Sequence, residues 1–339
     1  MEFYHDILEN LLDKLIDYRG KTPKKTLSGV PLVTAKIVKN GTINGYTEYI
    51  AEEDYDKWMV RGFPKVGDVI LTTEAPLGEV ALLKEEKVAL AQRIVCLRGK
   101  DNVLDNTYLK YYLQSGKGQK SLSARESGTT VTGIKQAELR RVDIEYPAYD
   151  DQRRIASILS SLDRKIELNN KINADLEEMA QAIFKNWFVD FEPFKDGKFV
   201  DSELGMIPEG WKVGRLEDIA NIVGGSTPSK AKPEYYTQKG IAWLTPKDLS
   251  SHPAVYSSRG EIDITQEGYN STSTKLMPRG TVLFTSRAPI GYISIAQNDI
   301  CTNQGFKSLV PRKAGTCFLY CFLKYVTPEI ENKSTGSTF

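Results

Sequence analysis

The chain contains one segment twice, and this repeat constrains its fold more than any other feature. The sequence VGDVILTTEAPLG at residues 66–78 returns as RGTVLFTSRAPIG at residues 279–291, 213 positions later. Further matches follow in the same order at nearly this spacing, beginning with residues 20–23 and 225–228. Solenoid repeats span roughly 20 to 50 residues, so a unit of this length predicts two domains that each bury their own core.

Both copies are predicted to be rich in strands. Short apolar runs with frequent alternation, separated by Gly and Pro turns, are typical of short β-strands. In the first copy they predict strands at residues 31–38, 66–73, 79–83, 94–97 and 142–146. Helices are predicted at residues 106–115, after the capping residues Asp105 and Asn106, and at residues 134–139.

A long helix is predicted between the copies. Apolar residues recur there at alternating steps of four and three, and no Gly or Pro lies between Asp150 and Glu192. The pattern predicts a helix of about 38 residues, about 57 Å long at 1.5 Å per residue, with a second helix alongside. The positions of this helix-pairing seam are Ile155, Leu159, Leu162, Ile166, Asn169, Asn173, Leu176, Ala180, Ile183 and Trp187.

Two features of the helix leave alternatives open. A buried Asn lowers stability but fixes register and partner choice, so we expect Asn169 and Asn173 to be paired; the alternative is solvent exposure. Trp187, Phe188 and Phe191 form an apolar cluster larger than one helix buries. Packing on the following domain is the favoured explanation, and docking of a partner subunit is the alternative.

Composition is that of an ordinary globular protein, with 40% hydrophobic and 26% charged residues among 339. The apolar runs are shorter than the roughly 18 residues that cross a bilayer, and the N-terminus lacks signal-peptide features. A cytoplasmic protein without a membrane partner is therefore expected. Cys317 and Cys321 are expected to be buried on one helix face with Phe318 and Phe322, not to bind zinc.

Charge is balanced overall but unevenly distributed. The net charge of +1 gives no global signal for a polyanionic partner. Residues 19–47, 107–125 and 301–328 nevertheless contain basic residues and no acid. Local basic faces bind phosphate whatever the total charge, although on charge alone a solvated surface is the favoured explanation.

No motif in the sequence predicts catalysis. It contains no Asn-Pro-Pro-Tyr or Asp-Pro-Pro-Tyr motif for adenine methylation, no convincing Gly-rich cofactor loop and no ATP-binding phosphate loop. Scattered carboxylates such as Glu85, Glu86 and Asp248 do not form a metal site by spacing alone. The sequence therefore predicts a protein that reads a ligand, with no catalytic residue, metal or cofactor of its own.

Several motifs together resemble one known family. They are DQRRIA at residues 151–156, LDRKIELN at 162–169, FKNWFVDF at 184–191, LGMIPEGW at 204–211, and the paired RGKTP at 19–23 and GGSTP at 224–228. With these motifs the chain resembles the specificity subunit of type I restriction-modification enzymes. The resemblance implies an α+β fold in which two duplicated, strand-rich target-recognition domains, 1–148 and 193–339, are joined by a long coiled-coil-type helix, 149–192.

The resemblance also implies partners. Each domain is expected to read half of a split DNA sequence, two antiparallel long helices act as a ruler, and methyltransferase subunits dock on this scaffold. The first copy runs on into a strand and the long helix, whereas the second ends at residues 336–339. The resemblance therefore implies a C-terminally truncated chain with an incomplete second domain. Its unpaired helix is expected to contact another copy or another subunit.

DNA-binding residues are expected where the copies share loops, because basic groups hold phosphates and polar side chains address base edges. Gln92 and Arg93 suit adenine and guanine edges, although a solvent-facing loop is equally consistent. Glu74 and Arg287 differ at aligned positions, as expected if the domains read different bases. The predicted residues are Arg19, Lys21, Lys24, Lys25, Lys36, Gln92, Arg93, Ser127, Thr129 and Thr130 in the first copy and Lys230, Lys232, Lys247, Arg287, Gln304 and Ser337 in the second.

Two further points leave alternatives open. The Gly-Thr and Gly-Ser loops at residues 127–130 and 335–338 either approach phosphate closely or are plain turns, and this choice is evenly balanced. Aromatic residues near the shared loops are candidates for the DNA face, although most buried aromatics simply belong to the core. These residues are Tyr46, Tyr49, Trp58, Tyr235, Tyr236 and Trp243.

The leading hypothesis is a DNA-binding specificity subunit that directs methylation and cleavage by partner subunits at a bipartite target. Its expected partners are double-stranded DNA, methyltransferase and restriction subunits, and a second copy through the unpaired helix. S-adenosylmethionine, ATP and Mg are expected in the partner subunits, with no cofactor in this chain. The alternatives are a coiled-coil assembly protein that binds no DNA and a nuclease that acts alone.

Overall fold

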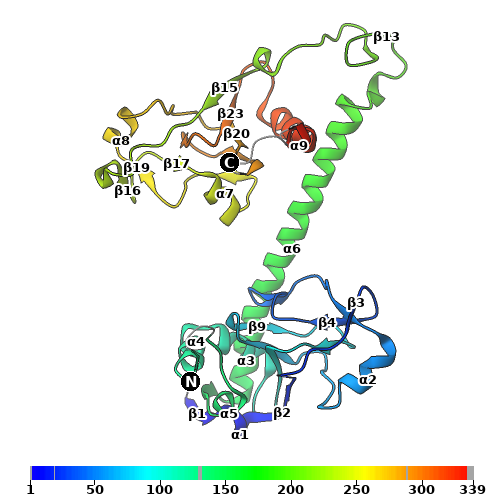
Figure 1. Cartoon of the computed structure of the whole chain (residues 1–339), viewed down its shortest axis with the longest axis vertical. Helices are drawn as coiled ribbons and strands as arrows, with labels where there is room; N and C mark the ends of the chain where they lie inside the picture. The colour runs from blue at the N-terminus through cyan, green and yellow to red at the C-terminus, as the bar shows by residue number, and fades with distance from the viewer. Residues whose placement is uncertain (1, 19, 129–131, 288, 334–339) are drawn as a thin grey trace. The chain divides into compact units, whose positions relative to one another are not determined.

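The computed structural model describes residues 2–18, 20–128, 132–287 and 289–333 (Figure 1). These residues divide into two compact units. Unit 1 ends at Asn169, and unit 2 begins at Asn170. The meeting point lies within α6 (Tyr149–Phe188), a helix of 40 residues that contributes one part to each unit. The predicted domain limits at 148/149 and 192/193 stay predictions.

Unit 1 is built on a four-stranded antiparallel sheet in the order β2-β11-β8-β9. These strands are β2 (Leu12–Asp17), β11 (Ile94–Gly99), β8 (Val69–Thr73) and β9 (Leu77–Leu82). A second sheet has the order β10-β4-β7-β3. Its strands are β10 (Ala89–Leu90), β4 (Val30–Val33), β7 (Tyr49–Ile50) and β3 (Lys25–Thr26).

Two short strand pairs and several helices complete unit 1. The pairs are β1 (Phe3–Ile7) with β12 (Asp143–Pro147) and β5 (Val38–Lys39) with β6 (Thr42–Ile43). The helices are α1 (Leu8–Leu11), η1 (Glu52–Asp54), α2 (Tyr55–Trp58), α3 (Asn106–Gln114), α4 (Gly116–Ser123) and α5 (Gln136–Arg140).

The central sheet of unit 1 is buried on both faces. Successive side chains of a strand point to opposite faces, so Ile70 of β8 packs into one core while Val69 and Leu71 pack into the other. All five residues of β8 are buried. This burial explains why its sequence is a continuous apolar run that ends in threonines rather than an alternating one.

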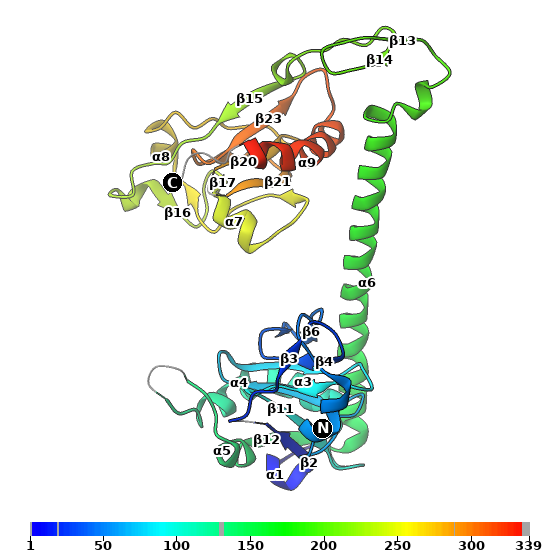
Figure 2. The ribbon, with the colours of Figure 1, turned by 45° about the vertical axis from the view of Figure 1, so that its right-hand side comes forward.

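Unit 2 repeats this arrangement with one strand more. Its central sheet has the order β15-β23-β20-β21-β18, and α9 packs against β21 and β20 (Figure 2). These elements are β15 (Ala220–Gly224), β23 (Lys307–Pro311), β20 (Val282–Ser286), β21 (Ile290–Ala296), β18 (Tyr256–Ser257) and α9 (Thr316–Lys333).

The remaining elements of unit 2 are short. The strand pairs are β13 (Phe199–Val200) with β14 (Ile207–Pro208), β16 (Tyr236–Thr237) with β19 (Asp263–Ile264), and β17 (Trp243–Leu244) with β22 (Cys301–Thr302). The helices are η2 (Glu192–Phe194), η3 (Leu216–Asp218), η4 (Pro233–Tyr235), α7 (Pro246–Ser251) and α8 (Gln266–Asn270).

The sequence repeat is confirmed down to individual backbone hydrogen bonds. The amide of Thr73 donates to Arg93 O at 2.8 Å in unit 1, and the amide of Ser286 donates to Gly305 O at 2.8 Å in unit 2. The strand orders β2-β11-β8-β9 and β15-β23-β20-β21 also correspond. The predicted α+β fold of two strand-rich domains joined by a long helix is confirmed.

Most predicted elements of the first copy are confirmed with shifted ends, and α3 is capped as expected, since the Asp105 carboxylate accepts from Tyr108 N at 2.8 Å. The single strand predicted at residues 31–38 is wrong. A turn closed by Ile37 N and Thr34 O at 3.2 Å divides it into β4 and β5.

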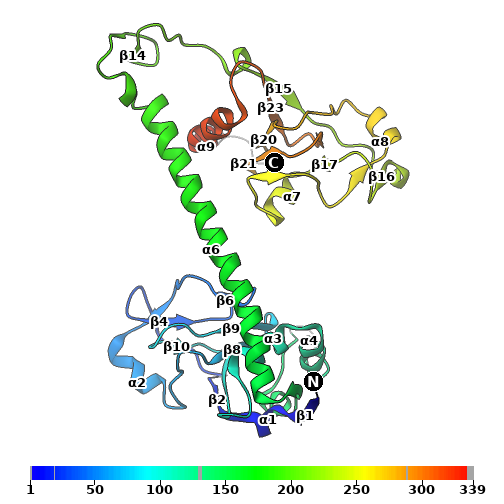
Figure 3. The ribbon, with the colours of Figure 1, turned by 180° about the vertical axis from the view of Figure 1, so that it is seen from behind.

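The first turns of α6 pack on unit 1, and the first seam position takes part, because Ile155 is partly buried against the core that contains Ala156. Gln152 and Ala156 are buried, and Asp163 receives hydrogen bonds from α3, which lies beside α6 in Figure 3. Seam residues Leu162 and Ile166 are 54% and 58% exposed. The pairing of Asn169 and Asn173 stays a prediction, and both side chains are exposed within the described residues.

The aromatic cluster at the end of α6 is packed inside unit 2, as the favoured explanation predicted. The rings of Phe188 and Phe191 lie 6.1 and 5.3 Å from that of Trp211, while Trp187 stays 47% exposed. Of the two cysteines expected to be buried, only Cys321 is buried, in the core of unit 2. The prediction for Cys317 is wrong, because this residue lies on the exposed side of α9.

No helix among the described residues is long and apolar enough to cross a membrane.

Candidate nucleic-acid interface

A pocket of about 920 Å³ opens on unit 2 beside the ends of β20 and β17. We name it the unit 2 pocket; its lining includes Lys230, Tyr236, Trp243, Lys247, Arg287 and Gln304. Four of the six DNA-binding positions predicted for the second copy therefore gather around one concave surface. They come from segments up to 74 residues apart in sequence, so only the fold brings them together.

Lys247 is presented by the first turn of α7. The Asp248 carboxylate accepts from Thr245 N and from Thr245 Oγ1, both at 2.7 Å, and this capping box fixes the start of the helix. Lys247 Nζ lies 3.0 Å from Glu261, and this hydrogen bond raises the pKa of Lys247. Both side chains are about three-quarters exposed, so the ion pair is weak enough to yield to a phosphate.

Arg287 and Gln304 meet at the strand ends of the central sheet. The amides of Ser286 and Arg287 both donate to Gly305 O, which ties the end of β20 to the turn before β23. A Cβ added at Gly305 would lie 2.9 Å from the ring of Pro246, so this turn requires glycine. Gln304 accepts a hydrogen bond from the Thr227 hydroxyl and is otherwise exposed.

The corresponding place in unit 1 has a different charge pattern. Arg93 pairs with Glu74 there, and their Nε and Oε1 atoms lie 2.9 Å apart. Lys36, which aligns with Lys247, is exposed, and Gln92 is half-buried. Lys21, Lys24 and Lys25 are exposed like Lys36. Lys25 Nζ lies 2.7 Å from Glu48, whereas Lys21 and Lys24 form no ion pair with another described residue.

The other predicted residues lie away from the unit 2 pocket or are not described. Lys232 Nζ hydrogen-bonds the Tyr235 hydroxyl at 3.0 Å and lies over its ring, and this bond raises the pKa of Lys232. Ser127 is exposed, and its amide donates to Gly133 O at 2.8 Å. Arg19, Thr129, Thr130 and Ser337 lie outside the described residues.

The aromatic residues divide between core and surface. Trp243 is buried and donates from Nε1 to Ser226 O at 3.1 Å, although its edge reaches the unit 2 pocket. Tyr236 is half-buried on the pocket wall, with its hydroxyl 2.6 Å from Pro228 O. Sequence reasoning missed Gln238 and Asn303 on the same lining. Asn303 adjoins Gln304, so the repeat alignment held the signal for it.

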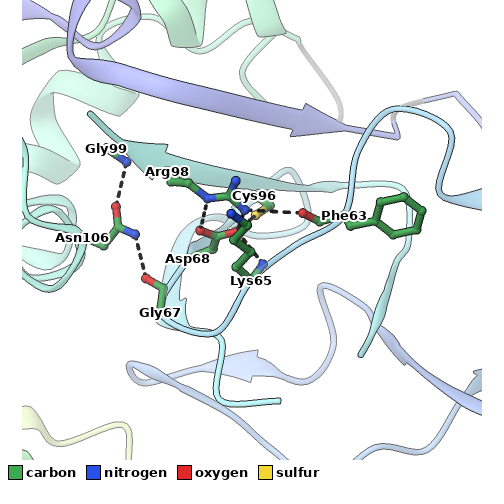
Figure 4. A network of polar contacts seen from close by, with 8 residues as sticks. All are labelled: Phe63, Lys65, Gly67, Asp68, Cys96, Arg98, Gly99 and Asn106. Atoms are coloured by element: carbon green, nitrogen blue, oxygen red, sulfur yellow. Dashed lines mark hydrogen bonds and ion pairs between the residues drawn. The ribbon is translucent and has the colours of Figure 1, made fainter. Parts of the chain in front are cut away.

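A buried ionic cluster in unit 1 ties the start of β8 to β11. Asp68 is 1% exposed and accepts two hydrogen bonds from Arg98, at 2.8 and 2.7 Å (Figure 4). The Cys96 thiol lies 3.2 Å from the same carboxylate; burial and that negative charge raise its pKa. Unit 2 has Thr281 in place of Asp68, so the cluster is not part of the repeated scaffold.

Among the described residues, no group of three or more His, Cys, Asp or Glu side chains is placed to hold a metal ion.

Comparisons with known proteins show the family of the chain. The family model described as the type I restriction modification DNA specificity domain matches residues 12–178 and 208–339. These two matches cover most of the chain and fall on the two copies of the repeat. The chain belongs to this family.

Individual relatives cover different shares of the chain. The type I restriction enzyme MjaIX specificity subunit of Methanocaldococcus jannaschii is 42% identical over 42% of this chain, but the match spans only 33% of that subunit. The putative MjaX specificity subunit of the same organism is 26% identical over 98% of this chain and 78% of its own length. A crystal structure of a type I restriction-modification S subunit from M. genitalium shares the fold, with a TM-score of 0.57, 19% identity and coverage of 100% of this chain and 81% of that one.

Proposed function

We propose that this chain is the sequence-specific DNA-binding specificity subunit of a type I restriction-modification system. The observation that carries the proposal is the convergence of Lys230, Lys247, Arg287 and Gln304 on the unit 2 pocket. Lysine ammonium groups neutralise phosphates, while Arg and Gln side chains hydrogen-bond base edges. Membership of the DNA specificity domain family supports the same conclusion.

The two units then read two half-sites of a bipartite target. Their scaffolds repeat, but the residues at the strand ends differ, as Glu74 and Arg287 illustrate. A repeated scaffold with different side chains at the same place supports recognition of different bases. The chain itself is non-catalytic in this proposal, and partner methyltransferase and restriction subunits carry S-adenosylmethionine, ATP and Mg. A cytoplasmic location follows from this role.

The exposed seam of α6 supports the proposed assembly with partners. Ile155 and Leu159 are half-buried, but the later apolar positions are exposed, with Leu162, Ile166, Leu176 and Ile183 each more than half exposed. An exposed stripe that is apolar except at Asn169 and Asn173 favours a second helix or a partner subunit against it. The same observation supports the second candidate function, a coiled-coil assembly protein that binds no DNA.

Salt dependence of DNA binding separates the two candidates. Fluorescence anisotropy with duplex DNA should give a logarithmic affinity that falls linearly with the logarithm of salt concentration. The double variant with Lys230→Glu and Lys247→Glu should bind duplex DNA at least about 10-fold more weakly. The slope of its logarithmic affinity against the logarithm of salt concentration, the salt slope, should be smaller by about two. Lys275→Glu is the matched control, because Lys275 is exposed on unit 2 but does not line the pocket.

An assembly protein would show no salt-dependent binding of duplex DNA. Equal effects of the pocket variants and of Lys275→Glu would also contradict the proposed interface.

A further inference from the structure

The two copies differ in charge at one strand end of the repeated fold. Because the backbone hydrogen bonds there match, Glu74 and Arg93 of unit 1 occupy the place at which unit 2 has the pocket residues Arg287 and Gly305. Unit 2 supplies its arginine from the end of β20. Unit 1 supplies its arginine from the turn before β11, and places a carboxylate where unit 2 has Arg287.

The Glu74–Arg93 ion pair is too exposed to contribute much to the stability of the fold. The side chains of Arg93 and Glu74 are 50% and 35% exposed, so water and salt screen their attraction. Arg93 also has a φ of 72°, in the left-handed region that side chains disfavour. Residues held in such conformations cluster at binding sites, where a fixed geometry serves recognition.

The backbone around this pair is held on both sides. Thr73 binds Arg93 O through its amide at 2.8 Å and accepts from Ile134 N at 2.9 Å. Gly133 approaches so closely that an added Cβ would lie 2.8 Å from Glu74 Cβ. The Glu74 carboxylate is therefore presented from a fixed position, and it binds Nε of Arg93.

The geometry of the ion pair suits one base. Glu74 engages Nε, so the guanidinium of Arg93 presents its terminal atoms Nη1 and Nη2 as a fork of donors. Such a fork matches O6 and N7 of guanine in the major groove. We propose that Arg93, positioned by Glu74, reads a guanine in the half-site of unit 1. The inference rests on the proposed function and makes Arg93 a specificity-determining residue of that site.

Selection of bound sequences from a randomised duplex DNA library by the full chain tests this directly. Arg93→Ala should abolish guanine preference at one position of one half-site and weaken binding of the wild-type site about 10- to 100-fold. The other half-site should keep its sequence, whereas Arg287→Ala should leave the half-site of unit 1 unchanged. Arg141→Ala is the matched control, since Arg141 forms a similarly exposed pair with Glu138.

Conservative variants distinguish base reading from a structural role. Arg93→Lys keeps the charge but loses the fork, so the guanine preference should fall while the salt slope is unchanged. Glu74→Gln keeps an acceptor for Nε and should keep the preference, whereas Glu74→Ala should weaken it. Circular dichroism of each variant confirms that the fold is retained.

The inference is overturned if Arg93→Ala weakens binding to all sequences equally and lowers the salt slope by about one, because Arg93 then contacts a phosphate. Full guanine preference in Arg93→Lys or in Arg93→Ala also overturns it. Failure of the wild-type chain to select any sequence overturns the proposed function together with this inference. Sequence selection by wild type that is insensitive to Arg93 overturns the inference alone.

Discussion

The contact between α3 and α6 in unit 1 gives a sharp test of what holds the long helix to its domain. Lys110 Nζ and the Tyr111 hydroxyl both lie 2.7 Å from Asp163 Oδ2. The Lys110 side chain is 7% exposed, so its ammonium group depends on this carboxylate. Asp163→Ala therefore leaves a buried charge without its counter-ion.

The magnitude follows from the burial of the two partners. Removing one member of a fully buried ion pair costs about 3–5 kcal/mol, but the Asp163 side chain is 44% exposed and water reaches it. We expect Asp163→Ala to lower the free energy of unfolding of unit 1 by about 2 kcal/mol. With an m-value of about 2 kcal/mol/M in urea, the midpoint of unfolding falls by about 1 M.

The pH dependence has a defined sign. Partial burial alone would raise the pKa of Asp163, but the hydrogen bonds from Lys110 and Tyr111 outweigh it and lower the pKa. A carboxyl whose pKa is lower in the folded state stabilises the fold above its unfolded pKa of about 3.9, and this stabilisation is lost as the pH falls further. The difference in stability between wild type and Asp163→Ala should therefore begin to shrink below about pH 4 and disappear only below the lower pKa that Asp163 has in the folded state.

Urea denaturation followed by circular dichroism, with hydrogen exchange of residues 106–114 to report on unit 1, measures the effect. Adding Lys110→Met to Asp163→Ala should recover most of the loss, because no buried charge then remains unpaired. Glu167→Ala is the control on the same helix, since its pair with Lys84 at 3.1 Å is exposed; it should cost less than about 0.5 kcal/mol. Equal costs for Asp163→Ala and Glu167→Ala would refute the reasoning.

Three further predictions concern other parts of the chain. Asp68→Ala should destabilise unit 1 by about 3–5 kcal/mol in thermal unfolding, because it leaves the Arg98 guanidinium unpaired; a loss below about 1 kcal/mol would contradict this. Leu162→Lys with Ile166→Lys should abolish self-association or assembly with a partner subunit in light scattering, and unchanged assembly would show that the seam is only a solvated face. Iodoacetamide should label exposed Cys317 before Cys321, whose pKa is raised by burial, and equal labelling in mass spectrometry would argue against this placement.

The long helix and the repeat were predictable because their signals are local or periodic. A stretch without Gly or Pro and with apolar steps of four and three specifies one helix, and α6 (Tyr149–Phe188) covers it. The repeat located Lys247, Arg287 and Gln304 by alignment alone, and these residues line the unit 2 pocket. Each success used information that lies along the chain.

The misses concern charges and strands whose partners lie far away in sequence. Residues 107–125 contain no acid, yet Lys110 pairs with Asp163 at 2.7 Å and Lys117 pairs with Glu145 at 2.6 Å. An acid-free stretch of sequence is therefore not an acid-free surface. The edge strand β1 escaped prediction for the same reason, because its exposed residues show no apolar alternation and β12 pairs with it from the other end of the domain.

Mapping of adenine methylation tests the central claim most directly. The chain would be co-expressed with the methyltransferase subunit of the proposed restriction-modification system in a methylation-free host, and modified sites would be located across the host genome. The account predicts that methylated sites share a bipartite motif, and that Arg287→Ala relaxes only one half of it. Methylation that is absent, or that occurs at a contiguous motif indifferent to Arg287, would contradict the account.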